Sequence, residues 1–392
     1  MLECLPASLN EEKNVELIKR SLSNNLKDRY GEREFLFYKP YILKTHLRKM
    51  IIKFTVGFDK SHKTYIGIHR ESDVQRFKHL FRMLQYLRSL GFDEKSELRV
   101  PYPVVFIPSL YFILMDEAEG ELLSTAVVNR KATDVKIFLE RSARWLVKLH
   151  RLGYDGLSHH PGIISAAKSY RRGNRYALDK EEEIASSIIY TRALRVTFPS
   201  LSEKIDSLSK ALVSMQREVF DNNTGSYNNN KNNNNNEENN TNSPNNTKVS
   251  LIHGDYHPKN IYVSDHAITV IDLEESRVGN PAFDLGYFVA QFKMSFGFSR
   301  KIFDWVDIFI REYIEGLQLQ SPSSTRDEDD YSGGAGLLKR QMKIYEAQTY
   351  LQRSYHTYWL LKLKPDIELV SKWLGQSQLC LEDAKGVENL GS

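Results

Sequence analysis

The chain has 392 residues, of which 41% are hydrophobic, enough apolar material for one large or two medium domains. Its 54 basic and 50 acidic residues are interspersed and leave a net charge of only +4, so no dominant nucleic-acid surface is expected. Cys4 and Cys380 are the only cysteines, which excludes a disulfide framework or a cysteine zinc site. No run of about 18 apolar residues occurs, and the first residues lack the pattern of a signal peptide. We therefore predict a cytoplasmic protein without a membrane span.

Residues 1–115 combine helical and strand patterns. Residues 11–30 predict a helix with one apolar side. Residues 73–90 predict an amphipathic helix, whose stripe consists of Phe77, Leu80, Phe81, Leu84, Leu87 and Leu90. Segments rich in β-forming side chains predict strands at 35–38, 41–43, 50–54, 64–69, 101–107 and 111–115. These elements predict a small α+β lobe.

The sequence becomes helical after a polar connector at 116–120. A long helix is predicted at 133–152, and helical patterns continue through 159–220. Residues 222–247 form an asparagine-rich segment with almost no apolar side chain to bury. Such a segment cannot offset the entropy cost of ordering, so we predict a disordered surface insertion.

Polar residues concentrate in one short stretch, 251–260, that follows a buried strand end. It carries His253, Asp255, His257 and Asn260. Two short strands are predicted directly afterwards, at 261–263 and 268–271, on either side of a polar turn. They form a hairpin that returns Asp272 to the side of Asn260.

Phosphoryl transfer from a nucleotide uses this set of side chains. A carboxylate accepts the proton of the attacking hydroxyl, and an amide oxygen with a second carboxylate holds Mg²⁺ on the donor phosphates. We assign Asp255 as the base, Asn260 and Asp272 as metal ligands, and His257 as a contact of the transferring phosphate. A single aspartate in a turn is more often a turn residue, but the full spacing favours catalysis.

His253-Gly-Asp255, Asn260, Asp272 and the segment from Gly279 to Asp284 resemble the aminoglycoside phosphotransferase and choline kinase-like group of small-molecule kinases. The resemblance implies a two-lobed, protein-kinase-like α+β fold. In it, 1–115 is the nucleotide-binding lobe, 116–120 the hinge, and 121–392 a helical lobe with the catalytic loop. It implies the same roles for Asp255, Asn260 and Asp272, and a bracing role for Asp284. ATP would bond to the main chain near Met115, Glu117 and Ala118.

The first lobe departs from the family pattern. Its third strand normally carries a lysine for the α- and β-phosphates, with a small residue two positions earlier. Here Gly67 occupies the small position and His69 the lysine position, and a shift by one residue would place Ile68 there. Lys53 and Arg70 are the other candidate cations. The helix at 73–90 has no central glutamate to pair with a lysine, and no G-x-G-x-x-G loop is present.

The remaining sequence indicates the substrate class. Asp284 is expected to cap a helix beginning at 285, and further helices are predicted at 300–317, 337–362 and 366–383, with a polar connector at 321–336. Only eleven residues separate Asp272 from Asp284, too few for the peptide platform of a protein kinase. We therefore predict phosphorylation by ATP of a small hydroxyl compound, such as a sugar, amino sugar or amino alcohol.

Two alternatives stay open at this stage. Glu274 and Glu275 could favour a cationic acceptor, although a neutral sugar fits equally well. The chain could also be a catalytically impaired nucleotide-binding or scaffold protein, since the first-lobe lysine is missing.

Overall fold

The computed structural model describes residues 9, 11–31, 34–38, 40–46, 49–58, 61–70, 74–152, 180–224, 250–318 and 328–386. Internal contacts divide these residues into two compact units. Unit 1 comprises those within Met1–Arg141 and Lys259–Ser276, and unit 2 those within Ser142–Gly156, Arg175–Pro258 and Arg277–Ser392. The predicted lobe boundaries at 115 and 121 stay a prediction. Most of the predicted insertion at 222–247 lies outside the described residues.

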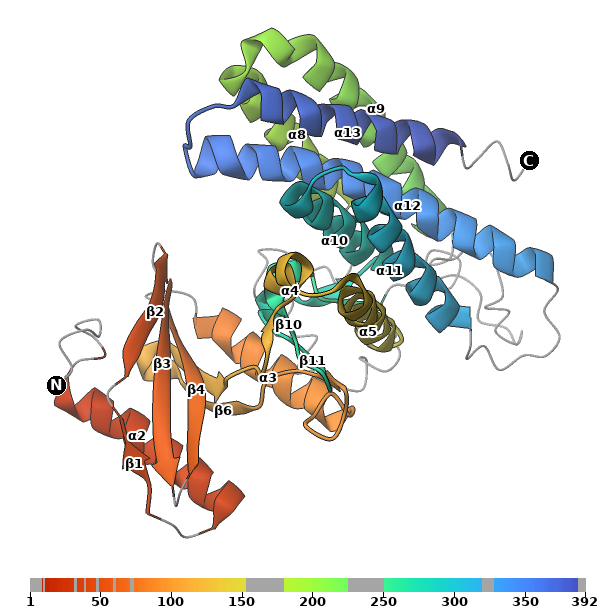
Figure 1. Ribbon diagram of the computed structural model, residues 1–392. Helices are drawn as coiled ribbons and strands as arrows, with labels where there is room; N and C mark the ends of the chain where they lie inside the picture. The colour runs from red at the N-terminus through yellow and green to blue at the C-terminus, as the bar shows by residue number, and fades with distance from the viewer. Residues whose placement is uncertain are drawn as a thin grey trace, which may run out of the picture. The chain divides into compact units, whose positions relative to one another are not determined.

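Unit 1 is built on an antiparallel sheet (Figure 1). The strand order is β1-β3-β4-β7-β6, and β2 also pairs with β3. The strands are β1 Leu36–Phe37, β2 Tyr41–His46, β3 Lys49–Phe58, β4 Ser61–Arg70, β6 Pro103–Ile107 and β7 Phe112–Asp116. In the register Ile52 lies opposite Gly67, which in turn lies opposite Leu114. Because side chains alternate along a strand, this register gives the sheet two distinct faces.

Helices α2 (Glu12–Tyr30) and α3 (Val74–Ser89) belong to the same unit. α2 buries Ile18, Leu22 and Leu26 in a core with side chains of one sheet face. Those sheet residues include Ile52, Val56, Tyr65, Phe112 and Leu114. α3 buries most of its predicted apolar stripe, and both helices lie where the periodicity predicted them.

A second, small sheet in unit 1 holds the predicted hairpin. Its order is β5 (Leu98–Arg99), β11 (Ile268–Val270), β10 (Ile261–Val263) and β8 (Glu121–Leu122). β10 and β11 pair antiparallel with Ile261 opposite Val270. Gly120 precedes β8 with φ +94°, and a Cβ there would lie 2.1 Å from the Val263 carbonyl oxygen. Only glycine therefore permits this close approach of the chain after residue 119.

Unit 2 is mostly helical. Its helices are α8 Lys180–Thr197, α9 Ser202–Thr224, α10 Pro281–Phe296, α11 Arg300–Gln318, α12 Glu328–Tyr355 and α13 Ile367–Gly386, together with the second half of α5 (Ala132–His150). α8, α9, α12 and α13 pack side by side (Figure 1). A two-stranded antiparallel ladder joins β9 (Ser250–Ile252) to β12 (Arg277–Gly279). The antiparallel sheet and this helical unit confirm the predicted α+β class.

α12 begins earlier than predicted. The sequence pattern placed its start at 337, after a polar connector, whereas the helix begins at Glu328. Among the described helices, none has the length and apolar character needed to cross a bilayer.

Candidate active site

The loop that follows β9 is held by one buried carboxylate. Asp284, on the first turn of α10, is completely buried. Its Oδ2 accepts a 2.7 Å hydrogen bond from the His253 main-chain N–H, and its Oδ1 accepts one of 2.9 Å from the Gly254 N–H. Gly254 has φ +82°, a conformation that glycine adopts without strain. The predicted bracing role of Asp284 is confirmed.

Asp284 does not cap its helix, contrary to expectation. Asn280 is the capping residue, because its side chain accepts a 2.9 Å hydrogen bond from the Ala282 N–H and Pro281 follows it. The Asp284 carboxylate is thereby left entirely to the loop and to His150.

His150 completes the support of Asp284. Its Nε2 lies 3.1 Å from Asp284 Oδ2, and its Nδ1 lies 2.6 Å from the Tyr313 hydroxyl. Burial raises the pKa of Asp284, but the hydrogen bond from His150 and those of the loop outweigh it and lower that pKa below its usual value.

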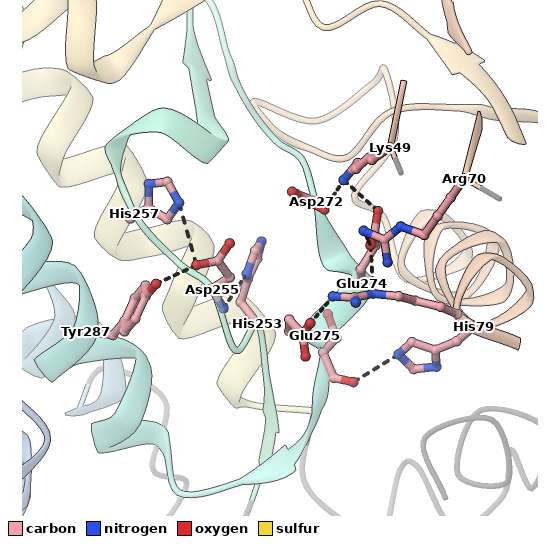
Figure 2. A network of polar contacts seen from close by, with 12 residues as sticks. Lys49, Arg70, His79, His253, Asp255, His257, Asp272, Glu274, Glu275 and Tyr287 are labelled. Atoms are coloured by element: carbon pink, nitrogen blue, oxygen red, sulfur yellow. Dashed lines mark hydrogen bonds and ion pairs between the residues drawn. The ribbon is translucent and has the colours of Figure 1, made fainter. Parts of the chain in front are cut away.

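Asp255, the predicted base, lies in this loop with its side chain 30% exposed. Its Oδ1 accepts a 2.7 Å hydrogen bond from the Tyr287 hydroxyl, and His257 Nε2 lies 3.6 Å from the same oxygen (Figure 2). Burial raises the pKa of Asp255, but His257 and Tyr287 together outweigh it and lower the pKa. Asp255 is therefore an ionised carboxylate at neutral pH.

Tyr287 was not recognised from the sequence. It lies on α10 three residues after Asp284, so the two side chains lie close on the same helix. This three-residue spacing on one helix was the sequence feature that could have indicated a place for Tyr287 in the site. Burial and the Asp255 charge raise the pKa of Tyr287, so its hydroxyl remains a hydrogen-bond donor.

Aromatic packing from α5 supports the same loop. Trp145 stacks on Tyr256 with ring centroids 5.6 Å apart and meets His253 edge-on at 6.1 Å. The Tyr256 hydroxyl donates a 2.7 Å hydrogen bond to the Ser142 carbonyl. His253 Nδ1 accepts a 3.2 Å hydrogen bond from the Asp255 N–H. Side chains from segments that precede the loop in sequence and from segments that follow it therefore hold the loop in place.

The predicted metal ligands, Asn260 and Asp272, both belong to unit 1 and flank its hairpin. The Ile271 N–H donates a 2.9 Å hydrogen bond to the Asn260 carbonyl, next to the pair Ile261–Val270. This confirms that the hairpin returns Asp272 to Asn260. Asp272 has φ +62°, an uncommon conformation for a residue other than glycine that is often found at functional sites. An amide and a carboxylate oxygen are donors that suit Mg²⁺.

Lys49, which the sequence did not single out, is the cation beside Asp272. Its Nζ lies 3.5 Å from Asp272 Oδ1 and 2.8 Å from Glu274 Oε1 (Figure 2). Burial lowers the pKa of Lys49, but the two carboxylates outweigh burial and raise it, so the ammonium stays charged. Lys49 and Lys53 share one face of β3, and Lys49 lies opposite Arg70 in the register. The spacing of the two lysines was the sequence feature that could have indicated this cation.

His69 lies on the opposite face of the sheet. It is 3% exposed, and its Nδ1 lies 3.0 Å from the Leu110 carbonyl oxygen. Gly67 shares that face, where a Cβ would lie 2.6 Å from Phe112 and 2.7 Å from Phe54. Gly67 is therefore small because of aromatic packing. A nucleotide role for His69 stays a prediction.

The suggested role of Glu274 and Glu275 in binding a cationic acceptor was wrong for Glu274. Glu274 is 2% exposed and forms ion pairs with Lys49, Arg70 and Arg76. Glu275 forms an ion pair with Arg76. A carboxylate enclosed by three cations is not available to a substrate.

The predicted hinge follows β7. Met115 is buried, and the Glu117 N–H donates a 3.2 Å hydrogen bond to the Thr64 carbonyl while its carboxylate accepts one of 2.7 Å from Lys53 Nζ. Within the described residues the Ala118 N–H has no hydrogen-bond partner. Ala118 is thus the main-chain donor that a nucleotide base could use.

Part of the chain matches a known protein family. Residues 238–326 match the phosphotransferase enzyme family (APH), a segment that includes Asp255, Asn260, Asp272 and Asp284. Together with the fold, this match confirms the predicted resemblance to this group of small-molecule phosphotransferases. A comparison with curated protein sequences gave no match.

Solved structures show the same fold at low sequence identity. Choline kinase from Cryptosporidium parvum Iowa II is similar with a TM-score of 0.52 and 11% identity, over 96% of this chain and 95% of that one. Ethanolamine kinase from Plasmodium vivax is similar with a TM-score of 0.51 and 15% identity, over 97% and 95% of the two chains. The predicted protein-kinase-like fold is thereby confirmed.

Proposed function

We propose that the protein transfers the γ-phosphoryl group of ATP to a hydroxyl group of a small molecule. In this proposal Asp255 is the general base, and Asn260 and Asp272 hold the Mg²⁺ that accompanies the nucleotide. When bound, the ion would neutralise charge on the donor phosphates. Lys49 takes the phosphate-binding role first assigned to His69, and Met115, Glu117 and Ala118 form the site for the base of the nucleotide.

The observation that carries the proposal is the state of Asp255. Its carboxylate is ionised, partly exposed, and held by the Tyr287 hydroxyl on a loop whose main chain is bound by Asp284. In this proposal the carboxylate orients an acceptor hydroxyl and accepts its proton as the new P–O bond forms and ADP leaves. In the same proposal His257, whose Nε2 lies 3.6 Å from Asp255 Oδ1, donates a hydrogen bond to a phosphoryl oxygen.

The choice of acceptor class rests on the short segment between Asp272 and Asp284 and on the ion pairs of Glu274. Only eleven residues join Asp272 to Asp284, so a peptide platform has no room there. Glu274 is neutralised by its own cations, which removes the strongest reason to favour a positively charged acceptor. Sugars, amino sugars and amino alcohols are the acceptors to test.

The competing proposal is a nucleotide-binding protein that has lost catalysis. An ATP-consumption assay with Mg²⁺ and pooled sugars, amino sugars and amino alcohols separates the two. Consumption that depends on one pool and is absent in Asp255→Ala supports the kinase. Binding of Mg²⁺-ATP without turnover on any pool, in the wild type, supports the impaired protein.

A further inference from the structure

Glu274 is the buried centre of a group of charges in unit 1. Its Oε1 lies 2.8 Å from Lys49 Nζ, and its Oε2 lies 2.7 Å from Arg76 Nε and 3.3 Å from an Arg70 guanidinium nitrogen (Figure 2). Burial raises the pKa of Glu274, but the three cations outweigh burial and lower it. The carboxylate is therefore ionised in the fold, which a buried carboxylate achieves only when it is paired.

Helix α3 holds the segment that carries Glu274 at two points. Arg76, on its first turn, binds both Glu274 and Glu275. His79 Nε2, one turn later, lies 2.9 Å from the Ser276 carbonyl oxygen. Burial lowers the pKa of His79, so the ring is neutral and Nε2 donates to that carbonyl. The helix thus fixes both the side chain and the main chain of residues 274–276.

The series of ion pairs from Arg76 through Glu274 to Lys49 ends beside Asp272. Lys49 Nζ is 2.8 Å from Glu274 Oε1 and 3.5 Å from Asp272 Oδ1, so Glu274 sets where the ammonium group lies relative to Asp272. Without Glu274, a lysine at the start of a strand would retain several rotamers, each with a different position of Nζ. Arg76 in turn restricts Glu274.

We infer that Arg76 and Glu274 are positioning residues that fix Lys49 for the phosphates of the nucleotide. The polarity of the pair is reversed relative to the arrangement expected from the sequence resemblance, in which the helix supplies a glutamate to a strand lysine. Here the helix supplies an arginine, and the glutamate comes from two residues after Asp272. This explains how the first lobe can orient a lysine although α3 has no central glutamate. The inference rests on the proposed function, because it assumes that the chain binds Mg²⁺-ATP.

The test is a double-mutant cycle on Mg²⁺-ATP affinity, measured by calorimetry, so that no acceptor is needed. Arg76→Met should weaken binding about tenfold in the wild-type background and by less than about twofold in a Lys49→Met background. Glu274→Gln should behave in the same way. Arg76→Lys, which keeps the charge, should recover most of the affinity. Lys78→Met, on the same helix and outside the cluster, is the matched control for loss of a positive charge.

Each outcome decides a separate question. Equal losses for Arg76→Met with and without Lys49 would overturn the inference, because Arg76 would then act independently of Lys49. A lower melting temperature with unchanged affinity would also overturn it, since Arg76 would be purely structural. Failure of the wild type to bind Mg²⁺-ATP would instead refute the proposed function. Melting curves of all variants keep loss of folding separate from loss of binding.

Discussion

The hydroxyl group of Tyr287 donates a 2.7 Å hydrogen bond to Oδ1 of Asp255, the carboxylate that we propose as the general base. The donor comes from helix α10 and the acceptor from the loop after β9. Because Tyr287 stabilises the charged form, it helps to keep Asp255 ionised in a largely enclosed position.

Tyr287→Phe should shift the acid limb of the pH–rate profile to higher pH. The hydroxyl favours the ionised carboxylate, so its loss raises the pKa of Asp255. A base works only when deprotonated, and activity should therefore be lost at a higher pH than in the wild type. At neutral pH, well above that pKa, Asp255 stays ionised in both proteins, so kcat/KM there should change little and the effect should be confined to the acid limb. Tyr111→Phe, at an exposed tyrosine, is the control, and an unchanged acid limb in Tyr287→Phe would contradict the assignment.

Asp255→Ala should abolish turnover while leaving Mg²⁺-ATP binding largely intact. The proposed base acts on the acceptor hydroxyl and is not assigned to the nucleotide. Turnover would be followed with the acceptor found in the pooled assay, and binding by calorimetry. Phosphorylation that persists in this variant would refute Asp255 as the base.

Asp272→Asn should weaken Mg²⁺-ATP binding by at least about tenfold, because a charged oxygen ligand is replaced by a neutral one. Asparagine tolerates the left-handed backbone conformation of this position, so the fold should be retained. Asp265→Ala, in the turn of the same hairpin, is the control. Equal nucleotide affinity for Asp272→Asn and the wild type would count against the metal role.

Asp284→Asn should destabilise the protein at neutral pH by about 2–4 kcal/mol, because a buried, multiply hydrogen-bonded carboxylate loses its charge. The pKa of Asp284 is lowered in the fold, so its contribution to stability is complete above the unfolded pKa of about 3.9. That contribution is lost as the pH falls through the folded pKa. The difference between wild type and variant in urea denaturation should therefore shrink below about pH 4. A constant difference across that range would exclude the ionised Asp284.

Gly67→Ala should lower stability by about 1–3 kcal/mol, because the added methyl group meets two aromatic rings in the core. Mg²⁺-ATP affinity should change little, since this face of β4 is the core face. Gly334→Ala on α12 is the matched control: its Cβ meets nothing within 4 Å, and alanine favours helix. A stable Gly67→Ala variant with weakened nucleotide binding would instead indicate that this face of β4 contacts the nucleotide.

Local spacing was enough to predict the hairpin that joins Asn260 to Asp272 and the apolar stripe of α3, whereas the bracing role of Asp284 was predicted from the family resemblance. The hairpin depends on residues close in sequence, and the stripe depends on a periodicity that is visible in the sequence. The strand carrying His69 was also found, but not which of its faces is buried. A strand alternates at every residue, so a shift of one position exchanges the two faces.

What the sequence determined by itself was the set of chemical groups and their order: a carboxylate, an amide and a second carboxylate, at a spacing that resembles that of the small-molecule kinases. Only the tertiary structure decided their partners. Lys49 and Glu274 are 225 positions apart, and Tyr287 and Asp255 are 32 apart on separate elements. No short-range pattern connects such pairs, because the strand register and helix packing that bring them together arise from burial of the whole core.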